Sequence, residues 1–304
     1  MESKASLPLR HILLAFLTVL IWGVNFIAIY VGLKDFPPFL FCTIRFGLSA
    51  LPLVFFLPRP KAPLKFIIAY GLLNFALQFG LLFSGIHMGL SPGLASLVLQ
   101  IQVFFSIGLA FLFFSEKPGI LKITGSLVSF IGIGIVAFNL TGGATLTGLL
   151  LTLLAALSWA SGNMFTKKVN AASPLSLVAW GNLVAFPFMA VASLTMEGHA
   201  AITASFHNIS WGTVAAVAYV VYLSTHLGYG IWGYLLKSYP TSAVVPFTLL
   251  IPIVGFISSA LFLNEDLNSW KLWASLFIMG GLLFNLFEKK ITKLLSLLKN
   301  KSHP

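Results

Sequence analysis

Long apolar segments follow one another along the whole chain, and they constrain its fold more than any other feature. A helix of about 20 residues crosses the roughly 30 Å hydrocarbon core of a bilayer. Ten runs of about that length are separated only by charges or by short clusters of Gly, Pro and Asn: 12–33, 37–57, 64–88, 92–114, 119–138, 146–166, 174–195, 210–235, 241–263 and 268–287. Since 58% of the residues are hydrophobic and only 8% are charged, the polar surface is too small for a water-soluble globule. We therefore predict an all-α membrane protein with ten transmembrane helices.

Short connections between the spans leave no room for a soluble domain, and we expect only residues 196–209 to form a loop of any length. The first run, 12–33, is too long for the core of a signal peptide and has no small-residue cleavage site after it. We interpret it as a retained span. The single cysteine, Cys42, excludes a disulfide framework and a thiolate metal cluster, and we expect a buried, inert thiol there and no metal site.

Lysine and arginine residues gather on one side of the predicted membrane. With the N-terminus inside, fifteen of them lie in inner segments: Lys4, Arg10, Arg59, Lys61, Lys65, Lys117, Lys122, Lys167, Lys168, Lys237, Lys289, Lys290, Lys293, Lys299 and Lys301. Two, Lys34 and Lys271, lie in outer segments, and Arg45 lies within a span. The positive-inside rule therefore predicts that both termini are cytoplasmic. The net charge of +11 forms no contiguous basic patch, so nucleic acid is not a predicted partner.

The two halves of the chain resemble each other. Paired landmarks occur in the same order in both: Trp22 with Trp159, Pro37 with Pro174, SPGLAS at 91–96 with YPTSAV at 239–244, and Glu116 with Glu265. Each half has five spans, an odd number, so the second copy is inserted upside down. Chance similarity between two apolar sequences is the alternative. We predict five-helix repeats at 1–142 and 143–290, followed by a basic cytoplasmic tail at 291–304.

Polar residues inside the spans are candidates for a substrate site, because polar groups at membrane depth face a protein interior or a wet cavity. Helical spacing places ten of them on faces that can line one cavity: Trp22, Asn25, Asn74, Gln78, Gln100, Trp159, Asn163, Tyr222, His226 and Tyr229. Asn and Gln side chains also bond helices to each other. Trp211, Trp270 and Trp273 are better explained as interfacial anchors. His226 is either a proton carrier or a neutral, hydrogen-bonded histidine.

Gln100 and Gln102 lie two residues apart in the otherwise apolar sequence LVLQIQVFF. Two residues rotate an α-helix by about 200°, so the two side chains point to nearly opposite sides. Gln100 aligns with Thr248 of the second half, which is also polar, and we assign Gln100 to the cavity. Gln102 shares its face with small residues that suit close helix contact, and we assign it to an interhelical hydrogen bond.

Arg45 is the only strong charge deep within a predicted span, and the acidic residues Glu116 and Glu265 fall at helix ends. A buried arginine meets backbone carbonyls, water or an anionic group brought by a substrate. Arg45 therefore either contacts a substrate carboxylate or extends to an interface and caps helix ends. Without an acid at mid-membrane depth, the sequence supplies no obvious proton carrier.

Signatures of catalysis and of ATP hydrolysis are missing from the sequence. It has no Walker motif, no Ser-His-Asp arrangement and no metal-ligand spacing. His199 and His207 have no acidic or cysteine neighbours that would suit a metal. We therefore predict a protein that is not an enzyme, has no catalytic residues and needs no cofactor.

Several motifs lie at family-specific places: WGVNF at 22–26, IRF at 44–46, SPGLASL at 91–97, and an acidic residue just after the fourth and ninth spans. With ten spans in two halves, the chain resembles the EamA family of the drug/metabolite transporter superfamily over nearly its whole length. Three stretches look closest to the bacterial exporters of O-acetylserine and cysteine in that family: GLASLVLQIQVFF at 93–105, SWASGNMFTKK at 158–168 and GYGIWGYLL at 228–236. His226 departs from the small aliphatic residue expected there, which leaves the substrate open.

The resemblance implies an exporter of small amino acids or amino-acid-like metabolites in the bacterial inner membrane, working by alternating access through a central cavity. Its partners would be a small-molecule substrate and membrane lipid, the chain would be a monomer or a weak dimer, and a substrate gradient or the proton-motive force would drive it. A multidrug or aromatic-compound exporter and an importer of similar metabolites share the fold and are the alternatives. Gly93 and the prolines Pro92, Pro240, Pro246 and Pro252 either let the fourth and ninth spans bend or form static kinks.

Overall fold

The computed structural model describes residues 7–115, 117–140, 144–169, 173–207, 209–239 and 241–301, and within these ranges every regular element is a helix. Nine helical segments are long and apolar enough to cross a membrane: Leu9–Gly32, Leu64–His87, Pro92–Phe113, Ile120–Phe138, Leu146–Phe165, Pro174–His207, Trp211–Ser238, Val245–Leu263 and Ser269–Glu288. A shorter apolar helix, Pro38–Val54, has 17 residues, the lower end of what a tilted crossing needs. These ten segments lie where the sequence predicts ten spans, and nine of them meet the length of a full crossing.

Several spans change helix type along their length, as the order of elements shows. The first half comprises α1 (Leu9–Gly32), α2 (Pro38–Val54), α3 (Leu64–Gly71), η1 (Leu72–Leu77), α4 (Gln78–His87), α5 (Pro92–Val98), η2 (Leu99–Ile101), α6 (Gln102–Phe114) and α7 (Ile120–Phe138). The second comprises α8 (Leu146–Val169), α9 (Pro174–Ala192), η3 (Ser193–Glu197), α10 (Gly198–His207), α11 (Trp211–Ala218), η4 (Tyr219–Gly228), α12 (Tyr229–Ser238), α13 (Thr241–Val244), η5 (Val245–Leu249), α14 (Leu250–Leu263) and α15 (Ser269–Lys301). Of the predicted features, Lys4, Glu116, Pro240 and residues 302–304 of the tail lie outside the described residues.

Four of the five changes of helix type in the described residues fall at matching places in the two halves, and the π-helical segment η3 of the seventh span has no counterpart in α2. The third and eighth spans contain the π-helical segments η1 and η4, and the fourth and ninth contain the 3-10 segments η2 and η5. The fourth and ninth spans also end alike, in the left-handed residues Ser115 (φ 55°) and Asn264 (φ 52°). π-helical turns inside longer helices are frequent at functional sites, so these four spans are the first place to look for one.

The prediction of a loop over 196–209 is wrong for the described residues, because residues 198–207 form α10. The carboxylate of Glu197, at the end of η3, accepts hydrogen bonds from the backbone N–H groups of Phe39 (2.6 Å) and Leu40 (2.9 Å). These are orphan donors of the first turn of α2, where a negative charge is favourable. Glu197 therefore fixes the direction of the chain before α10 begins at Gly198, which has a φ of 81°.

Helices α2 and α9 form a pair that is joined at both ends. At one end Glu197, which follows α9, caps α2. At the other end Ser176 Oγ donates to the carbonyl of Pro58 (2.5 Å), and Trp180 Nε1 donates to that of Leu57 (3.2 Å). Because each helix comes from a different half of the chain, the pair joins the two halves.

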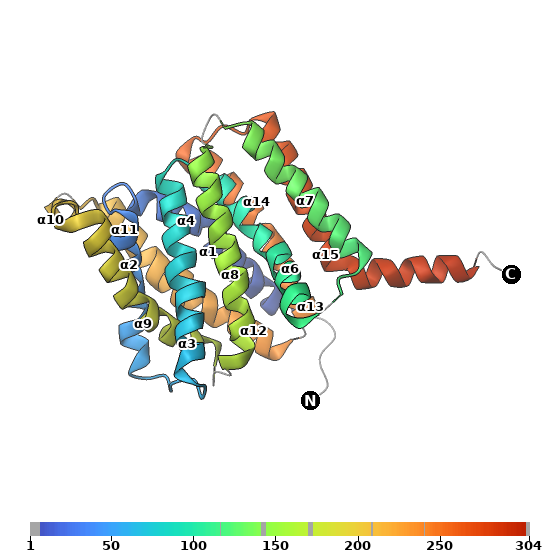
Figure 1. The fold of residues 1–304 in the computed structure, drawn as a ribbon, viewed down its shortest axis with the longest axis horizontal. Helices are drawn as coiled ribbons and strands as arrows, with labels where there is room; N and C mark the ends of the chain where they lie inside the picture. The colour runs from blue at the N-terminus through green and yellow to red at the C-terminus, as the bar shows by residue number, and fades with distance from the viewer. Residues whose placement is uncertain are drawn as a thin grey trace.

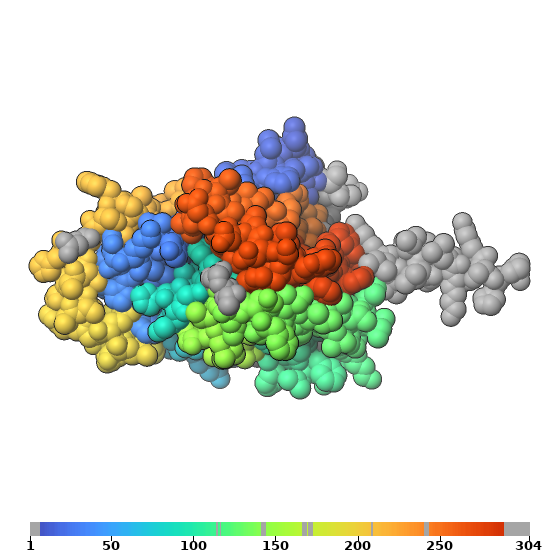
Figure 2. Space-filling view, turned by 90° about the horizontal axis from the view of Figure 1, so that it is seen from above, coloured from blue at the N-terminus to red at the C-terminus, as the bar shows by residue number. Residues whose placement is uncertain are grey.

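Helices α7 and α15 form a second cross-half pair, which lies at one edge of the bundle (Figures 1 and 2). The two backbones approach closely at Gly125 and Gly281, and Ser129 Oγ donates to the carbonyl of Ile278 (2.9 Å). Small residues of this kind let transmembrane helices pack without a hydrophobic driving force between them.

Large apolar side chains are exposed around the bundle, including Phe55 (78%), Phe138 (92%) and Trp211 (87%). Exposed apolar area of this extent is unsuited to water, whereas lipid tails cover it without penalty. The exposed band therefore agrees with the membrane assignment that the composition predicts.

Candidate functional site

Arg45 lies in the middle of α2 with only 2% of its surface exposed, so it does not extend to an interface. Its guanidinium carbon lies 4.0 Å from the centre of the Phe79 ring and 5.8 Å from that of Phe83. Nη2 lies 3.5 Å from Thr225 Oγ1, at the limit of a hydrogen bond. Nη1 is buried and has no hydrogen-bond partner among the described residues. The cation is thus held by aromatic faces, with one donor group unused.

Trp22 and Tyr229 close one side of this region. Trp22 Nε1 donates to the carbonyl of Ser224 (3.1 Å), and its ring lies 5.2 Å from that of Tyr229 and 5.4 Å from that of Trp232. The same span also contacts α2, where Thr225 lies beside Arg45 and His226 beside the carbonyl of Ser49. The eighth span therefore brings side chains against both the first and the second span.

The π-helical segment η4 carries two polar side chains in this region, Thr225 and His226. Thr225 Oγ1 donates to the carbonyl of Val220, five residues earlier (2.7 Å). His226 Nε2 lies 3.0 Å from the carbonyl of Ser49, so this nitrogen carries the proton of that hydrogen bond. This contact agrees with the hydrogen-bonded interpretation of His226.

Unpaired polar atoms lie on several of the helices that meet around η4 and α9. Six buried side-chain atoms of the described residues have no partner: Asn25 Oδ1, Arg45 Nη1, Ser49 Oγ, Asn74 Nδ2, Asn182 Nδ2 and Asn182 Oδ1. They lie on α1, α2, η1 and α9, and α2 and η1 both contact α9 while α1 and α2 both contact η4. A buried polar atom without a partner costs about 1–3 kcal/mol, so such a group of atoms suits water or a polar ligand.

Asn182, Ser49 and Thr225 are absent from the residues selected by sequence. Asn182 is an amide inside a span, so the rule that selected Asn25 and Asn74 also applies to it. Ser and Thr hydroxyls, in contrast, bond to their own helix so often that sequence alone does not single them out. Only the meeting of α2 with η4 distinguishes Ser49 and Thr225.

Gln100 and Gln102 have the opposite roles to those predicted. Gln100 Nε2 donates to the backbone carbonyl of Thr248 (3.2 Å) and so makes the interhelical bond. Gln102 is half-buried, and its side chain has no hydrogen bond to any described residue. It lines a hollow of about 330 Å³ that also contacts Ser106, Lys117 and Lys122.

The other selected residues divide between interior and surface. Asn74 and Gln78 are buried, and Trp159 packs against the core. Asn163 is exposed, and Tyr222 is 53% exposed with its ring edge-on to His226 at 5.7 Å. The expectation that Asn163 and Tyr222 face an interior cavity is therefore corrected.

The physical reasons for these two corrections are local. Gly162 is the residue of α8 that lies against Asn74, and the next residue, Asn163, is turned about 100° away from that contact. Tyr222 lies in η4, whose π-helical turns hold more residues than an α-helix. Tyr222 and His226 still lie side by side, with ring centres 5.7 Å apart, but Tyr222 is the more exposed of the two.

Comparison with known proteins gives matches along nearly the whole chain. The model of the EamA-like transporter family matches residues 9–138 and again 146–287. A protein of Salmonella typhimurium named "Probable amino-acid metabolite efflux pump" is 42% identical over 287 residues, covering 92% of this chain and 96% of that protein. The Escherichia coli K12 protein of the same name is 40% identical over 280 residues, covering 90% and 94%.

More distant similarities agree with these. The "Uncharacterized inner membrane transporter YedA" of Escherichia coli K12 is 24% identical, covering 84% of this chain and 83% of that protein. One crystal structure is similar with a TM-score of 0.61 at 16% identity, covering 91% of this chain and 95% of the other. At that identity the likeness shows the fold alone.

Proposed function

The chain belongs to the EamA-like transporter family, within the drug/metabolite transporter superfamily, and we propose that it exports small amino acids or amino-acid-like metabolites. It is a multi-pass membrane protein of the bacterial inner membrane. The two relatives named amino-acid metabolite efflux pumps support both the substrate class and the direction.

The observation that carries the substrate class is Arg45, buried in the second span with Nη1 unpaired. A carboxylate accepts strong, charge-assisted hydrogen bonds from a guanidinium, and no acidic side chain of the described residues forms an ion pair with Arg45. The carboxylate of an amino acid would complete this pairing. The unpaired oxygens of Asn25 and Asn182 are acceptors that suit an amino group.

Trp22, Gln78, Trp159 and Tyr229 complete our proposed binding surface, with Asn74 as a further donor. In this proposal Gln100 acts beside the site as a link between two spans, because its amide is already bonded to Thr248. In this proposal His226 orients the eighth span through its hydrogen bond to the Ser49 carbonyl and does not act as a proton carrier during transport.

Alternating access between two inverted repeats is the mechanism we propose. Two separate matches to one family model, one in each half, support the repeat. So do the matching helix distortions and the cross-half pairs α2 with α9 and α7 with α15. The positive-inside rule would place Leu9 and Glu288 on the cytoplasmic side and Glu265 on the outer side.

Purified protein in proteoliposomes tests this function. Labelled cysteine, O-acetylserine, threonine and an aromatic amino acid are offered one by one, and a lipophilic cation serves as the comparison. We expect transport of at least one of the first three compounds and its loss in Arg45→Met. Transport of the cation and of none of the amino acids would overturn the proposal, and inside-out vesicles distinguish export from import.

A further inference from the structure

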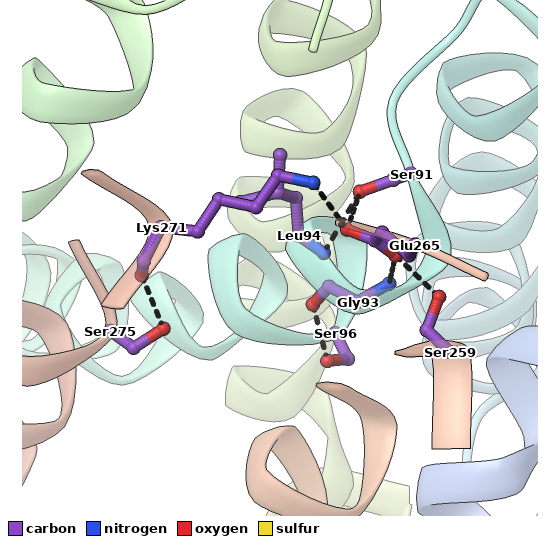
Figure 3. Close-up of polar contacts among 8 residues, drawn as sticks. All are labelled: Ser91, Gly93, Leu94, Ser96, Ser259, Glu265, Lys271 and Ser275. Atoms are coloured by element: carbon purple, nitrogen blue, oxygen red, sulfur yellow. Dashed lines mark hydrogen bonds and ion pairs between the residues drawn. The ribbon is translucent and has the colours of Figure 1, made fainter. Parts of the chain in front are cut away.

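A buried carboxylate ties the two halves together at one end of the bundle (Figure 3). Glu265, just after α14, accepts hydrogen bonds from Ser91 Oγ (2.5 Å), from the Gly93 N–H (3.2 Å), from Ser259 Oγ and from Lys271 Nζ (3.0 Å). The sequence places Glu265 at the end of the ninth span and Lys271 in an outer segment, yet their side chains are only 7% and 0% exposed. The site thus contains a buried, fully bonded ion pair.

The four donors to Glu265 come from different halves of the chain. Ser91 and Gly93 begin the fourth span, in the first half of the chain, whereas Ser259 and Lys271 belong to the second half, like Glu265 itself. Movement of one half against the other would therefore break only the bonds from Ser91 and Gly93. Glu265 would keep its counter-ion Lys271, so separation of the halves leaves no buried charge unpaired. Breaking the ion pair itself would leave two buried charges without a partner.

The neighbouring seam between the fourth and ninth spans is also closed. A Cβ atom on Gly255 would lie 2.5 Å from Ser96 Oγ, so the Ser96 side chain lies directly against the backbone of the ninth span, one turn from Gly93. Ser96 is only 1% exposed. On the far side of the ion pair a hollow of about 370 Å³ reaches Ser91, Ser259 and Glu265. The carboxylate therefore lies between an open hollow and a closed seam.

Lys122, the counterpart of Lys271 in the first half, lies at the opposite end of the bundle and is more exposed. Lys122 follows Glu116 at the spacing at which Lys271 follows Glu265, and Glu116 lies outside the described residues. Lys122 is 36% exposed, is paired with Glu288 at 3.4 Å and lines the hollow near Gln102. One lysine of the pair is thus fully buried in a closed seam, and the other is partly exposed beside an open hollow.

We propose that Glu265 and its four donors form a latch that closes this end of the transport path and opens in each transport cycle. In this latch the carboxylate holds the first half through Ser91 and Gly93. Lys271 is a positioning residue that holds the carboxylate in place in both the closed and the open arrangement. The inference rests on the proposed alternating access, and it goes beyond the substrate class.

Accessibility of Ser96 tests the latch without any substrate. Cys42 is replaced by Ala, Ser96→Cys is introduced as the only thiol, and a membrane-impermeant maleimide is added from the side of Glu265. We expect slow labelling with the latch intact and roughly tenfold faster labelling in Glu265→Gln, the factor that follows from losing about one charged hydrogen bond. Equal rates in both proteins would overturn the proposal.

Two matched controls keep the result specific. Glu288→Gln makes the same chemical change in the ion pair at the opposite end and is expected to leave the labelling rate unchanged. Ser275→Ala removes a hydroxyl whose hydrogen bond stays within α15, on the carbonyl of Lys271, and is also expected to have no effect. Faster labelling in either control would show a general loosening of the bundle and would contradict a latch.

A milder variant covers the case in which Glu265→Gln does not fold. Ser91→Ala removes one donor that crosses between the halves and is expected to speed labelling, whereas Ser91→Thr keeps the hydroxyl and is expected to restore the slow rate. An unchanged rate in Ser91→Ala would overturn the latch. If labelling responds as expected while no amino acid is transported, the latch stands and the proposed substrate class fails.

Discussion

The side-chain amide of Gln100 donates a hydrogen bond of 3.2 Å to the backbone carbonyl of Thr248, the residue at the corresponding place in the other half of the chain. The bond lies where the helix of each span changes from α-helical to 3-10 geometry, in η2 and η5. It joins the fourth and ninth spans at membrane depth, below the latch at Glu265. The two halves are therefore linked at two levels along the same seam.

Replacing Gln100 by Ala is expected to lower the free energy of unfolding in detergent micelles by roughly 0.5–1.5 kcal/mol, because an interhelical bond is lost and a buried carbonyl is left unpaired. Gln102→Ala is the matched control, since its side chain has no hydrogen bond to the described residues. Denaturation of both variants measures the difference. A larger loss in Gln102→Ala would contradict the assignment.

Replacing Arg45 by Met is expected to abolish selectivity for a carboxylate while leaving the protein folded. The ratio of transport of cysteine to that of cysteamine, which lacks the carboxylate, should fall about 10- to 100-fold, corresponding to a charged hydrogen bond of ~1.5–3 kcal/mol. Arg45→Lys should give an intermediate ratio, because ammonium lacks the planar stacking on Phe79. An unchanged ratio in the Met variant would remove Arg45 from the site.

Asp35, in the turn between α1 and α2, provides a test of pH dependence outside the spans. Hydrogen bonds from the side chains of Ser210 and Thr213 and from the Ser210 backbone N–H (2.8 Å) hold the pKa of this carboxyl below its usual range. A lowered pKa in the folded state stabilises the protein above the ordinary carboxyl pKa, and this stabilisation is lost as the pH falls through the lowered value. We expect Asp35→Asn to flatten the fall in Tm between about pH 5 and pH 3. A fall as steep as that of the parent protein would contradict this role.

Adjacent glycines of α15 test the close contact between α7 and α15. A Cβ on Gly281 would collide with the carbonyl of Gly125 and with Ser129, whereas a Cβ on Gly280 would meet nothing within 4 Å. Gly281→Ala is therefore expected to destabilise the protein by about 1–3 kcal/mol, and Gly280→Ala to be neutral or to stabilise it by up to about 1 kcal/mol. Thermal unfolding of the two variants checks this, and equal Tm values would contradict the contact.

Sequence reasoning predicted the positions of the spans well, because hydrophobic length and helix-ending residues are local properties. The helix α10 was missed, and so was the contact that precedes it, since Glu197 is held by donors from a helix far away in the chain. The assignments of Gln100 and Gln102 were reversed for a similar reason. Rotation along a helix shows that the two point apart, but only the ninth span decides which of them meets a partner.

The substrate site itself stays a prediction, although several of its candidate residues have the burial that polarity at membrane depth predicts. Arg45, Asn25 and Asn74 were selected by polarity at membrane depth, and all three are buried with an unpaired atom. Tyr222 was selected together with His226, and the two rings do lie side by side, but Tyr222 is 53% exposed, which the hydrophobic pattern does not indicate. The pairing of Glu265 and Lys271 was missed: Glu265 was assigned to a helix end and Lys271 to an outer segment, since their burial depends on three segments that meet only in the folded chain.

The pair of α2 and α9, bonded at both of its ends, has a mechanical consequence. Two halves that rock against each other need a fulcrum, a place where relative displacement is smallest. Bonds at Glu197 on one side and at Ser176 and Trp180 on the other leave this pair little freedom to separate. Spin labels placed across α2 and α9 should therefore keep a constant distance through the cycle, while labels across α5 and α14 should move apart and together.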